Sequence, residues 1–401
     1  MTPPLRGANP VFTPGRLGPI TLRNRVVKCG TNEGLSRSGL VTDALIEWHR
    51  RFAAGGVGMT TLAYCSVSTL GKTFADQIWM REETLPGLRR LTAAMKAEGA
   101  RVAIQLGHAG WFAHPRASGA RPLGPSRTFS PHSQTFSRAL SPLQLDETRE
   151  DFARATRLAV EAGFDAIEVH VGHGYLLSQF LCPYNNRRSD QYGGSLENRA
   201  RFPRAVLSEV RRAAGSSVAV YAKLNMMDGF RGGLALHEGV AVARMIEADA
   251  SVDALQLTGG HTTRTPMFLM RGGVPLREMI RYEKDRLRAF GLRIFGPFLI
   301  RPWPFEEAFF LEAARQFKAE LHTPIMLLGG INRLETMNHA IEEGFAFVAM
   351  GRALLREPDL LLRMQRGERD ASLCNHCNQC VAEMERETGT ACVFWHVAKT
   401  P

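Results

Sequence analysis

The sequence lacks any long hydrophobic run. None of its apolar stretches approaches the roughly 18 residues that a transmembrane helix requires, so we predict no membrane partner. The first residues, MTPPLRGANPVFTPGRLGP, also lack the basic segment followed by an apolar one that marks a secretory signal. These two absences predict a cytoplasmic protein.

Clustered charge of one sign is missing as well. The chain carries 50 Lys and Arg against 39 Asp and Glu, a formal net charge of +11, but it has no block of five like charges. This pattern does not indicate a surface that binds nucleic acid. A dispersed basic surface favours phosphorylated small molecules, so we expect a small-molecule substrate and no nucleic-acid partner.

The common nucleotide-binding motifs are absent. No Gly-x-Gly-x-x-Gly follows a predicted strand, and no Walker sequence occurs. The nearest run, Gly55-Gly56-Val57-Gly58, precedes a predicted strand and therefore has the wrong context. The chain is thus expected to have no dinucleotide-binding domain of its own.

Short apolar runs that read as strands alternate with amphipathic segments. A hydrophobic share of 44% supplies enough side chains for a large core. Alternation of this kind predicts an α/β fold, either a (β/α)₈ TIM barrel, which we favour, or an open doubly wound sheet. The predicted strands are Arg25–Gly30, Met59–Tyr64, Val102–Gly107, Ala166–His170, Val218–Asn225, Ala254–Gly259, Pro324–Gly329 and Phe345–Met350.

Helices and long connections complete the expected architecture. Helical patterns cover Phe152–Ala162, Leu196–Ala213 with Ser195 as N-cap, and Phe305–Ala319. The Gly-Pro pair within Phe12–Arg23 predicts a hairpin that closes the bottom of the barrel. The long segments Ala109–Ser141 and Thr262–Phe298 follow strand ends on the face where barrel active sites lie, so we expect them to shape the substrate site.

Strand alternation points several polar side chains into the barrel. Successive strand residues face opposite sides, and the apolar side should pack on the helices. By this rule Gln105, His170, Lys223 and Asn225 converge near the top of the interior. A buried lysine needs a partner, which is either a bound anionic or polar ligand or an internal ion pair with Glu168.

The stretch IEVHVGHGY, residues 167–175, contains two histidines and a tyrosine next to a strand end. His170 and His173 have three possible roles: ligands of a metal, donors to a substrate oxygen, or ordinary turn residues. A metal-dependent barrel hydrolase would add His261 and Asp228 as ligands. That class would also want His-x-His on the first strand, which this sequence lacks.

Glycines follow the last two predicted strands, at Gly329-Gly330-Ile331-Asn332 and at Gly351-Arg352. Loops after the seventh and eighth strands are the usual phosphate site of such barrels. Backbone N–H groups beside Gly330 and Gly351, with the guanidinium of Arg352, therefore predict a phosphate grip.

Seven cysteines are present, and four of them cluster near the C-terminus. The spacing of Cys374, Cys377, Cys380 and Cys392 is typical of a metal site, and an iron–sulfur cluster, structural zinc and unmetallated thiols all remain open. We therefore divide the chain into a barrel, residues 1–365, and a Cys-rich segment, residues 366–401.

Four stretches of the sequence resemble the old yellow enzyme family of FMN-dependent barrel reductases. They are GPITLRNRVV at residues 18–27, IQLGHAG at 104–110, the IEVHVGHGY stretch, and NRRSDQYGGSLENR at 186–199. The resemblance spans roughly Phe12 to Pro358. The cysteine spacing resembles the iron–sulfur segment of the 2,4-dienoyl-CoA reductase and trimethylamine dehydrogenase branch.

The resemblance implies a role for each matching residue. His170 and His173 would bind the carbonyl oxygen of the substrate, and Tyr175 would deliver a proton. Gln105 would contact the flavin, Lys223 would replace the family's usual arginine beside it, and Gly330, Gly351 and Arg352 would hold the FMN phosphate. The branch with the cysteine spacing implies a 4Fe–4S cluster at those thiols. The resemblance to the family implies no role for Thr31, Asn32 or Glu33.

The implied activity is NAD(P)H-driven reduction of an activated C=C bond. The alternatives are an electron-transfer subunit that needs a partner and the metal-dependent hydrolase. A homo-oligomer is also compatible with the sequence.

Overall fold

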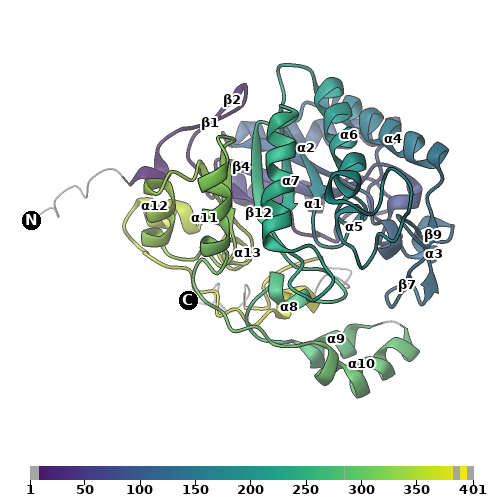
Figure 1. The fold of residues 1–401 in the computed structure, drawn as a ribbon. Coiled ribbons are helices and arrows are strands. Elements are labelled where there is room, and N and C mark those ends of the chain that lie inside the picture. Colours follow the sequence, from purple (N-terminus) through teal and green to yellow (C-terminus); the bar gives the residue numbers. More distant parts are fainter. Residues whose placement is uncertain (1–8, 284, 383–388, 395–401) are drawn as a thin grey trace, which may run out of the picture.

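Eight parallel strands close into a barrel at the centre of the molecule (Figure 1). The structure is a computed structural model and describes residues 9–283, 285–382 and 389–394. The predicted TIM barrel is confirmed, and the open sheet is excluded. In barrel order the strands are β3 (Val26–Lys28), β4 (Met59–Ser66), β5 (Arg101–Gly107), β10 (Ala166–Val171), β11 (Ala219–Asn225), β12 (Ala254–Thr258), β13 (Ile325–Leu328) and β14 (Phe347–Met350).

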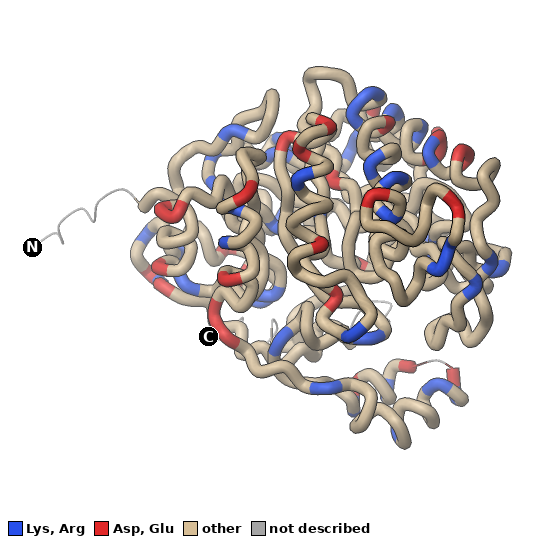
Figure 2. Tube along the Cα trace, viewed as in Figure 1, with Lys and Arg blue, Asp and Glu red and all other residues tan. Residues whose placement is uncertain are grey.

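Helices surround the barrel and bury their apolar faces against its outer surface. Charged residues of both signs are interspersed on the outer faces of these helices (Figure 2). Ser195 accepts a hydrogen bond from the backbone of Asn198, so the predicted N-cap is confirmed. The barrel helices are α1 (Asp43–Ala54), α2 (Leu85–Ala97), α4 (Pro142–Glu161), α6 (Leu196–Ala214), α7 (Leu236–Ala248), α11 (Leu311–Glu320), α12 (Leu334–Glu342), α13 (Arg352–Arg356) and α14 (Leu360–Gln365).

Two predicted helices have the wrong start. The pattern at Phe152–Ala162 is only the second half of α4, which begins ten residues earlier because Ser141 and Gln144 form a capping box. The helix predicted over Phe305–Ala319 begins at Leu311 instead. Ala308 has a φ of 52°, in the left-handed region, and this conformation interrupts any helix that runs through it.

An antiparallel hairpin closes the bottom of the barrel, as predicted. It consists of β1 (Gly15–Leu17) and β2 (Ile20–Leu22). Its side chains Leu17 and Leu22 are fully buried in the cluster that fills the lower barrel interior, which includes Tyr221 and Phe347. The hairpin, at the top of the view in Figure 1, therefore caps the N-terminal end of the barrel. The opposite, C-terminal end of the strands, called the upper end here although it points down in Figure 1, is left for a site.

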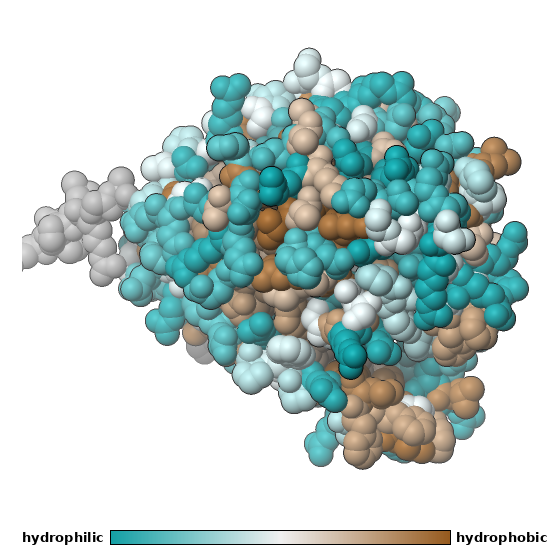
Figure 3. All heavy atoms as spheres, in the orientation of Figure 1, coloured by the Kyte–Doolittle hydropathy of each residue, from teal (hydrophilic) through white to brown (hydrophobic). Residues whose placement is uncertain are grey.

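The long connections at the upper end contain secondary structure of their own. Residues 109–141 form η4 (Gly110–Phe112), α3 (Pro115–Ser118) and two pairs of short strands, β6 (Leu123–Gly124) with β9 (Arg138–Ala139) and β7 (Phe129–Ser130) with β8 (Thr135–Phe136). Residues 262–298 form α8 (Pro266–Leu269) and a hairpin of α9 (Leu276–Tyr282) and most of α10 (Arg286–Leu299). This hairpin extends away from the barrel (Figure 1). Its α10 helix contributes much of the apolar surface at that end (Figure 3).

The C-terminal segment folds back over the upper end of the barrel. The Trp48 indole donates to the Thr390 carbonyl at 3.0 Å, and the Thr390 amide donates to the Glu33 carbonyl at 2.8 Å. His376 stacks on Phe305, with 3.4 Å between ring centroids. A short helix, α15 (Gln379–Ala382), follows. The remaining elements are α5 (Leu176–Leu181) and three 3-10 turns, η1 (Pro10–Phe12), η2 (Thr69–Gly71) and η3 (Glu82–Thr84). Within the described ranges, no helix is both long and apolar enough to span a bilayer.

Candidate active site

A cavity of about 290 Å³ lies at the upper, C-terminal ends of the barrel strands. The eight residues to which the resemblance gives a role outside the cysteine cluster all line it, although they come from five different strand ends. These residues are Gln105, His170, His173, Tyr175, Lys223, Gly330, Gly351 and Arg352. The strand order and the alternation of side chains therefore bring these residues together as expected. Asn225, also predicted to converge here, does not line it and instead accepts from the His173 amide at 3.0 Å.

The floor of the cavity carries a buried charge pair. The ammonium of Lys223 lies 2.8 Å from the Glu168 carboxylate, and both side chains are almost fully buried. The Gln105 amide donates to the same carboxylate oxygen. The predicted ion pair of Lys223 with Glu168 is present, and Lys223 also lines the cavity, where a bound ligand stays a prediction. The pair places a fixed cation on the wall of the cavity without leaving it uncompensated.

The two histidines and the tyrosine form one aromatic cluster. The His170 ring lies 5.0 Å from that of His173 and 4.8 Å from that of Tyr175, between centroids. His173 Nε2 is 2.8 Å from the Thr258 hydroxyl, and its φ of 59° turns the chain after β10. His170 Nδ1 is buried without a hydrogen-bond partner among the described residues. One buried ring nitrogen of the cluster is therefore left without a hydrogen bond to the described residues.

Burial sets the protonation of this cluster. It holds the pKa of His170 well below the usual value and lowers the pKa of His173 to about 3, and the charge of Lys223 adds to both effects. It also raises the pKa of Tyr175 to about 12. At neutral pH both imidazoles are uncharged hydrogen-bonding groups, and Tyr175 keeps its proton.

The opposite end of the cavity is lined by glycines. Gly329 and Gly330 have φ values of 118° and 72°, and a Cβ on either residue would overlap Phe309 or Phe310. A Cβ on Gly351 would lie 3.2 Å from the Cys29 sulfur. Glycine is therefore required at positions 329 and 330 by the positive φ and by the two neighbouring rings.

The guanidinium of Arg352, predicted to bind a phosphate, already makes hydrogen bonds within the protein. Its Nη1 donates to the Arg271 carbonyl at 2.8 Å and also bonds the Asn378 side chain. Burial lowers the pKa of Arg352. Part of its guanidinium is therefore committed to holding the C-terminal segment, and the rest faces the cavity.

Several residues that line the cavity were not predicted. Cys29, Thr31 and Asn32 follow β3, and Tyr64 lies in β4. These residues lie within or directly after predicted strands, and this position could have indicated that they line the cavity. His376 and Thr390 come from the C-terminal segment and had no local signal. Cys380, predicted as a metal ligand, also lines the main cavity. Glu33 has a structural role, because its carboxylate accepts the Ala63 amide at 3.0 Å and lies 3.4 Å from His49.

The residues of the metal-hydrolase alternative do not gather around a metal. His261 Nε2 pairs with the Asn185 side chain at 3.2 Å, and Asp228 accepts from Asn225 and from the Leu234 backbone. In the part of the chain that the structure describes, no three His, Cys, Asp or Glu side chains are placed to hold a metal ion. His170 and His173 belong instead to the cluster with Tyr175.

The four C-terminal cysteines lie together near Arg352. Cys374, Cys377, Cys380 and Cys392 all line one narrow cavity of about 20 Å³, together with Arg352. They share this cavity but are not gathered as metal ligands within the described residues. Burial raises the pKa of Cys374 and raises that of Cys380 to about 12. The four cysteines are thus close neighbours around one small cavity.

The main cavity suits a flavin mononucleotide. One side offers an amide and a cation, Gln105 and Lys223, which match the polar edge of an isoalloxazine ring. The glycine-lined end suits a phosphate. His170, His173 and Tyr175 line the same cavity. The chemistry of the donors therefore fits both the cofactor and a polar substrate.

Comparison with known proteins gives the family. Residues 10–261 match the NADH:flavin oxidoreductase / NADH oxidase family. The chain belongs to this family. Its predicted resemblance and its enzyme class, an FMN-dependent NAD(P)H oxidoreductase, are confirmed.

Individual relatives of this flavin oxidoreductase differ in length and in reaction. The 4,4'-dithiodibutanoate disulfide reductase of Rhodococcus erythropolis is 50% identical over 96% of this chain and 94% of its own. The solved 2-naphthoyl-CoA reductase complex superposes with a TM-score of 0.82 at 25% identity, over 96% of this chain and 57% of that one. An old yellow enzyme homologue from Zymomonas mobilis has a TM-score of 0.71 at 21% identity, covers 90% of this chain and 94% of its own, and shares the fold. The chain spans about half the length of several other curated relatives, such as the metal reductase of Desulforamulus reducens, 53% of which it covers.

Proposed function

We propose that this oxidoreductase holds FMN in the main cavity and uses NAD(P)H to reduce the activated C=C bond of a small molecule, such as an α,β-unsaturated carbonyl or a dienoyl compound. The observation that carries the proposal is the convergence of Lys223, Gln105, the histidine pair and Tyr175 in one cavity. Bound there, FMN supplies the hydride through its N5 atom.

The chain's own groups would hold the cofactor at both ends. Gln105 would bind the pyrimidine edge of the flavin, and Lys223 would supply positive charge there. Because Lys223 is itself paired with Glu168, its position is fixed before the cofactor arrives. Gly330 and Gly351 would give backbone N–H groups to the phosphate, with Arg352 beside them. A lysine in place of arginine keeps the charge and loses the bidentate donor.

The histidine pair and Tyr175 would handle the substrate. Negative charge grows on the carbonyl oxygen as hydride reaches the β-carbon, and His170 and His173 can donate hydrogen bonds to that oxygen as neutral imidazoles. Tyr175 would then give its proton to the α-carbon. The raised pKa of Tyr175 keeps this proton in place until the substrate needs it.

A disulfide is the second candidate substrate, because a relative of similar length, 50% identical, is a disulfide reductase. In that reaction the S–S bond breaks, one sulfur takes the hydride and leaves as a thiol, and the other leaves as a thiolate. Tyr175 would protonate the thiolate. The same residues therefore serve either reaction, and a direct comparison of substrates decides between them.

The C-terminal thiols are the proposed site of an iron–sulfur cluster or of zinc, on the spacing and on their shared cavity. No step of the reaction is assigned to a metal. Iron, sulfide and zinc analysis of anaerobically purified protein tests this proposal, with Cys380→Ser as the variant that should lose the metal. An electron-transfer partner, a homo-oligomer and a cytoplasmic location stay predictions.

The Tyr175→Phe variant tests the proposed chemistry. We expect it to slow reduction of an enone or a disulfide by roughly 100-fold or more, because the proton donor is lost. Reduction of the flavin by NAD(P)H should stay within about twofold of the wild type, since that half-reaction needs no substrate proton. Stopped-flow measurement of the two half-reactions separates the effects. Equal slowing of both would contradict the role of Tyr175, and activity only after adding a second protein would favour the electron-transfer alternative.

A further inference from the structure

Helix α10 exposes an apolar face on the hairpin that it forms with α9. It carries six of the eleven large apolar side chains that are exposed among the described residues, and 43–78% of each of the six is accessible. They are Leu287, Phe290, Ile294, Phe295, Phe298 and Leu299. Figure 3 shows apolar surface gathered at this hairpin. An exposed apolar patch of several hundred Å² usually marks a binding surface, so this face calls for a partner.

The opposite side of α10 has its partners within the chain. A Cβ on Gly296 would lie only 2.7 Å from Leu276, so α10 lies directly against α9 there. Arg288 pairs with Glu283 at 3.0 Å, and its guanidinium lies 3.5 Å from Nδ1 of His132. The hairpin therefore uses one side of α10 for its own fold and leaves the apolar face outside.

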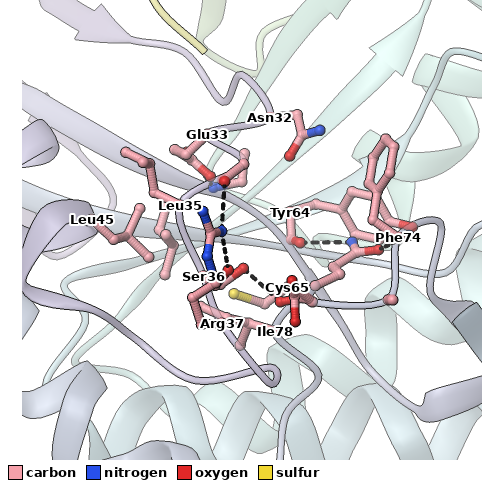
Figure 4. Close-up of a pocket in the computed structure, with 16 residues that line it drawn as sticks. Asn32, Glu33, Leu35, Ser36, Arg37, Leu45, Tyr64, Cys65, Phe74 and Ile78 are labelled. Atoms are coloured by element: carbon pink, nitrogen blue, oxygen red, sulfur yellow. Dashed lines mark hydrogen bonds between the residues drawn. The ribbon is translucent and has the colours of Figure 1, made fainter. Parts of the chain in front are cut away.

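The cavity that adjoins the main one differs from this face, because its walls bond one another. It measures about 340 Å³, and Asn32 and Tyr64 line both cavities (Figure 4). The Gln77 side chain donates to the Tyr64 carbonyl at 2.9 Å, and the Ser36 hydroxyl donates to the Asp76 carbonyl at 2.7 Å. These polar groups are paired within the chain, whereas the apolar face of α10 is uncovered.

The exposed side chains of α10 form a stripe along the helix. Successive residues of an α-helix are turned by about 100°, so six positions fall within an arc of about 140°. They are Leu287, Phe290, Gly291, Ile294, Phe295 and Phe298. The three arginines of the helix, Arg286, Arg288 and Arg293, lie outside this arc. An apolar stripe of this width is typical of a helix that packs on another element.

The residues of this stripe are arranged almost symmetrically about its midpoint, which lies between positions 292 and 293. The pairs at equal distances from the midpoint are Leu287 with Phe298, Phe290 with Phe295, and Gly291 with Ile294. In an interface with two-fold symmetry, residue i of one copy contacts residue j of the other, and j contacts i. Two antiparallel α10 helices with the axis at this midpoint would therefore bring each residue of the stripe against its counterpart.

Gly291 has a packing reason only in such a pair. A Cβ at this position would meet nothing within 4 Å, and its φ is not in the left-handed region, so the single chain does not require glycine there. Glycine in the interior of a helix is destabilising relative to alanine. In the antiparallel pair Ile294 of the second copy would lie over Gly291, and the missing side chain would give it room.

We propose that the stripe on α10 joins two copies of this chain through an antiparallel contact between their α10 helices. Side chains of this size expose about 150–250 Å² each when fully accessible, so the five large ones of the stripe leave roughly 600 Å² uncovered. A pair would bury roughly 1,200 Å² from these side chains alone, which reaches the size of a specific interface. The inference does not depend on the proposed chemistry.

Leu287→Glu tests the surface, with Leu143→Glu as a matched control. Both leucines are the second residue of their helix, and they are 69% and 68% exposed. We expect the wild-type protein to sediment as a dimer at micromolar concentrations. Leu287→Glu occurs twice in each interface and should weaken the dimer at least roughly 100-fold, whereas Leu143→Glu should leave it unchanged. Sedimentation velocity of the purified full-length protein measures both.

A swap of two residues tests the arrangement. Gly291→Ile alone meets open space in the single chain, so it should fold and yet weaken the dimer at least roughly tenfold by overpacking against Ile294 of the second copy. The double variant Gly291→Ile/Ile294→Gly restores a large residue opposite a small one and should regain most of the affinity. Circular dichroism checks that each variant is folded.

Disulfide trapping tests the antiparallel direction. Position 287 would lie opposite position 298 of the second copy but roughly 16 Å along the axis from its own counterpart. Oxidation of a mixture of Leu287→Cys and Phe298→Cys should therefore link the two chains, as peptide mapping detects, while Leu287→Cys alone should not link to itself through residue 287.

Three results would overturn the inference. They are a monomeric wild type, a dimer that survives Leu287→Glu, and a dimer whose affinity Gly291→Ile leaves unchanged. A monomer that sediments with vesicles of anionic phospholipid, and loses this binding with Leu287→Glu, would assign the stripe to a membrane surface instead.

Discussion

Two fully buried lysines lie on strands of the same barrel and face opposite sides of its wall. Lys223, on β11, points inward and lies 2.8 Å from Glu168. Lys28, on β3, contacts α1, where its ammonium lies 4.3 Å from the centroid of Trp48. Its hydrogen-bond partner is the Thr31 hydroxyl, at 2.8 Å, and no carboxylate of the described residues forms an ion pair with it. One lysine is thus held by a counter-ion and the other by neutral groups.

The difference shows how a carboxylate partner affects the role of a buried lysine. Burial lowers the pKa of Lys28 to about 8, with Glu33 opposing the shift from a distance. From its ordinary value this change corresponds to roughly 3 kcal/mol of destabilised charge. Lys223, with its carboxylate, is the lysine that lines the main cavity. A paired cation can therefore act on a ligand, whereas an unpaired one mainly costs stability.

Lys223→Met should have the largest effect. It removes the cation at the proposed flavin edge and leaves the buried Glu168 carboxylate with the Gln105 amide but without its counter-ion. We therefore expect at least roughly 100-fold weaker FMN binding and a loss of about 3–5 kcal/mol in the free energy of unfolding. Flavin titration of the apoprotein and urea unfolding measure the two effects.

Two further variants keep the Lys223 test informative. The double variant Lys223→Met/Glu168→Gln has no buried charge, so it should regain much of the stability and still bind FMN weakly. Lys223→Arg should retain the flavin. Wild-type FMN affinity in the double variant would show that the charge of Lys223 does not act on the cofactor.

Lys28→Met should raise the free energy of unfolding, whereas Lys223→Met should lower it. The unfolded chain keeps the proton of this lysine up to a pH near its ordinary pKa of 10.5, whereas the folded chain releases it near pH 8. Wild-type stability should therefore rise through this window, because folding releases a proton there. At pH 7 the methionine should raise the free energy of unfolding by up to roughly 3 kcal/mol, and the gain should shrink toward pH 10. Urea unfolding of both proteins across this range gives the difference, and a pH-independent difference would contradict the shifted pKa.

Thr31→Val should have the smallest effect. It removes the hydroxyl that bonds the Lys28 ammonium, so we expect a loss of about 1–2 kcal/mol at pH 7. The loss should vanish when Lys28 is already methionine, which a double-mutant cycle of unfolding free energies detects. If the loss is the same in both backgrounds, Thr31 does not support Lys28.

The same two lysines show which side-chain directions could be predicted from the sequence. Lys223 was predicted to face the interior because its strand alternates between apolar and polar residues. Lys28 follows Val26 and Val27, which are buried on opposite faces of β3, so alternation gave no direction for it. The strand order and the convergence of His170 and Gln105 followed from local patterns for the same reason that Lys223 did.

The features of the site that the sequence did not predict depend on long-range packing. Thr390 and His376 reach the main cavity from a segment whose sequence carries only the cysteine spacing. The commitment of Arg352 to carbonyls of the β12 connection also depends on that packing. Thr73, whose amide donates to the Gln77 side chain, lies in a loop that no strand or helix period marks. Contacts between distant segments have no signature in local periodicity.

The central claim is that the main cavity holds FMN beside Lys223. An absorbance spectrum of the anaerobically purified protein, recorded before and after addition of NADH or NADPH, tests it most directly. We predict a yellow protein with about one FMN per chain, bleached by the nicotinamide and recoloured by an enone or a disulfide substrate, and a Lys223→Met/Glu168→Gln variant without this colour. A folded wild-type protein that stays colourless after reconstitution with FMN would contradict the account.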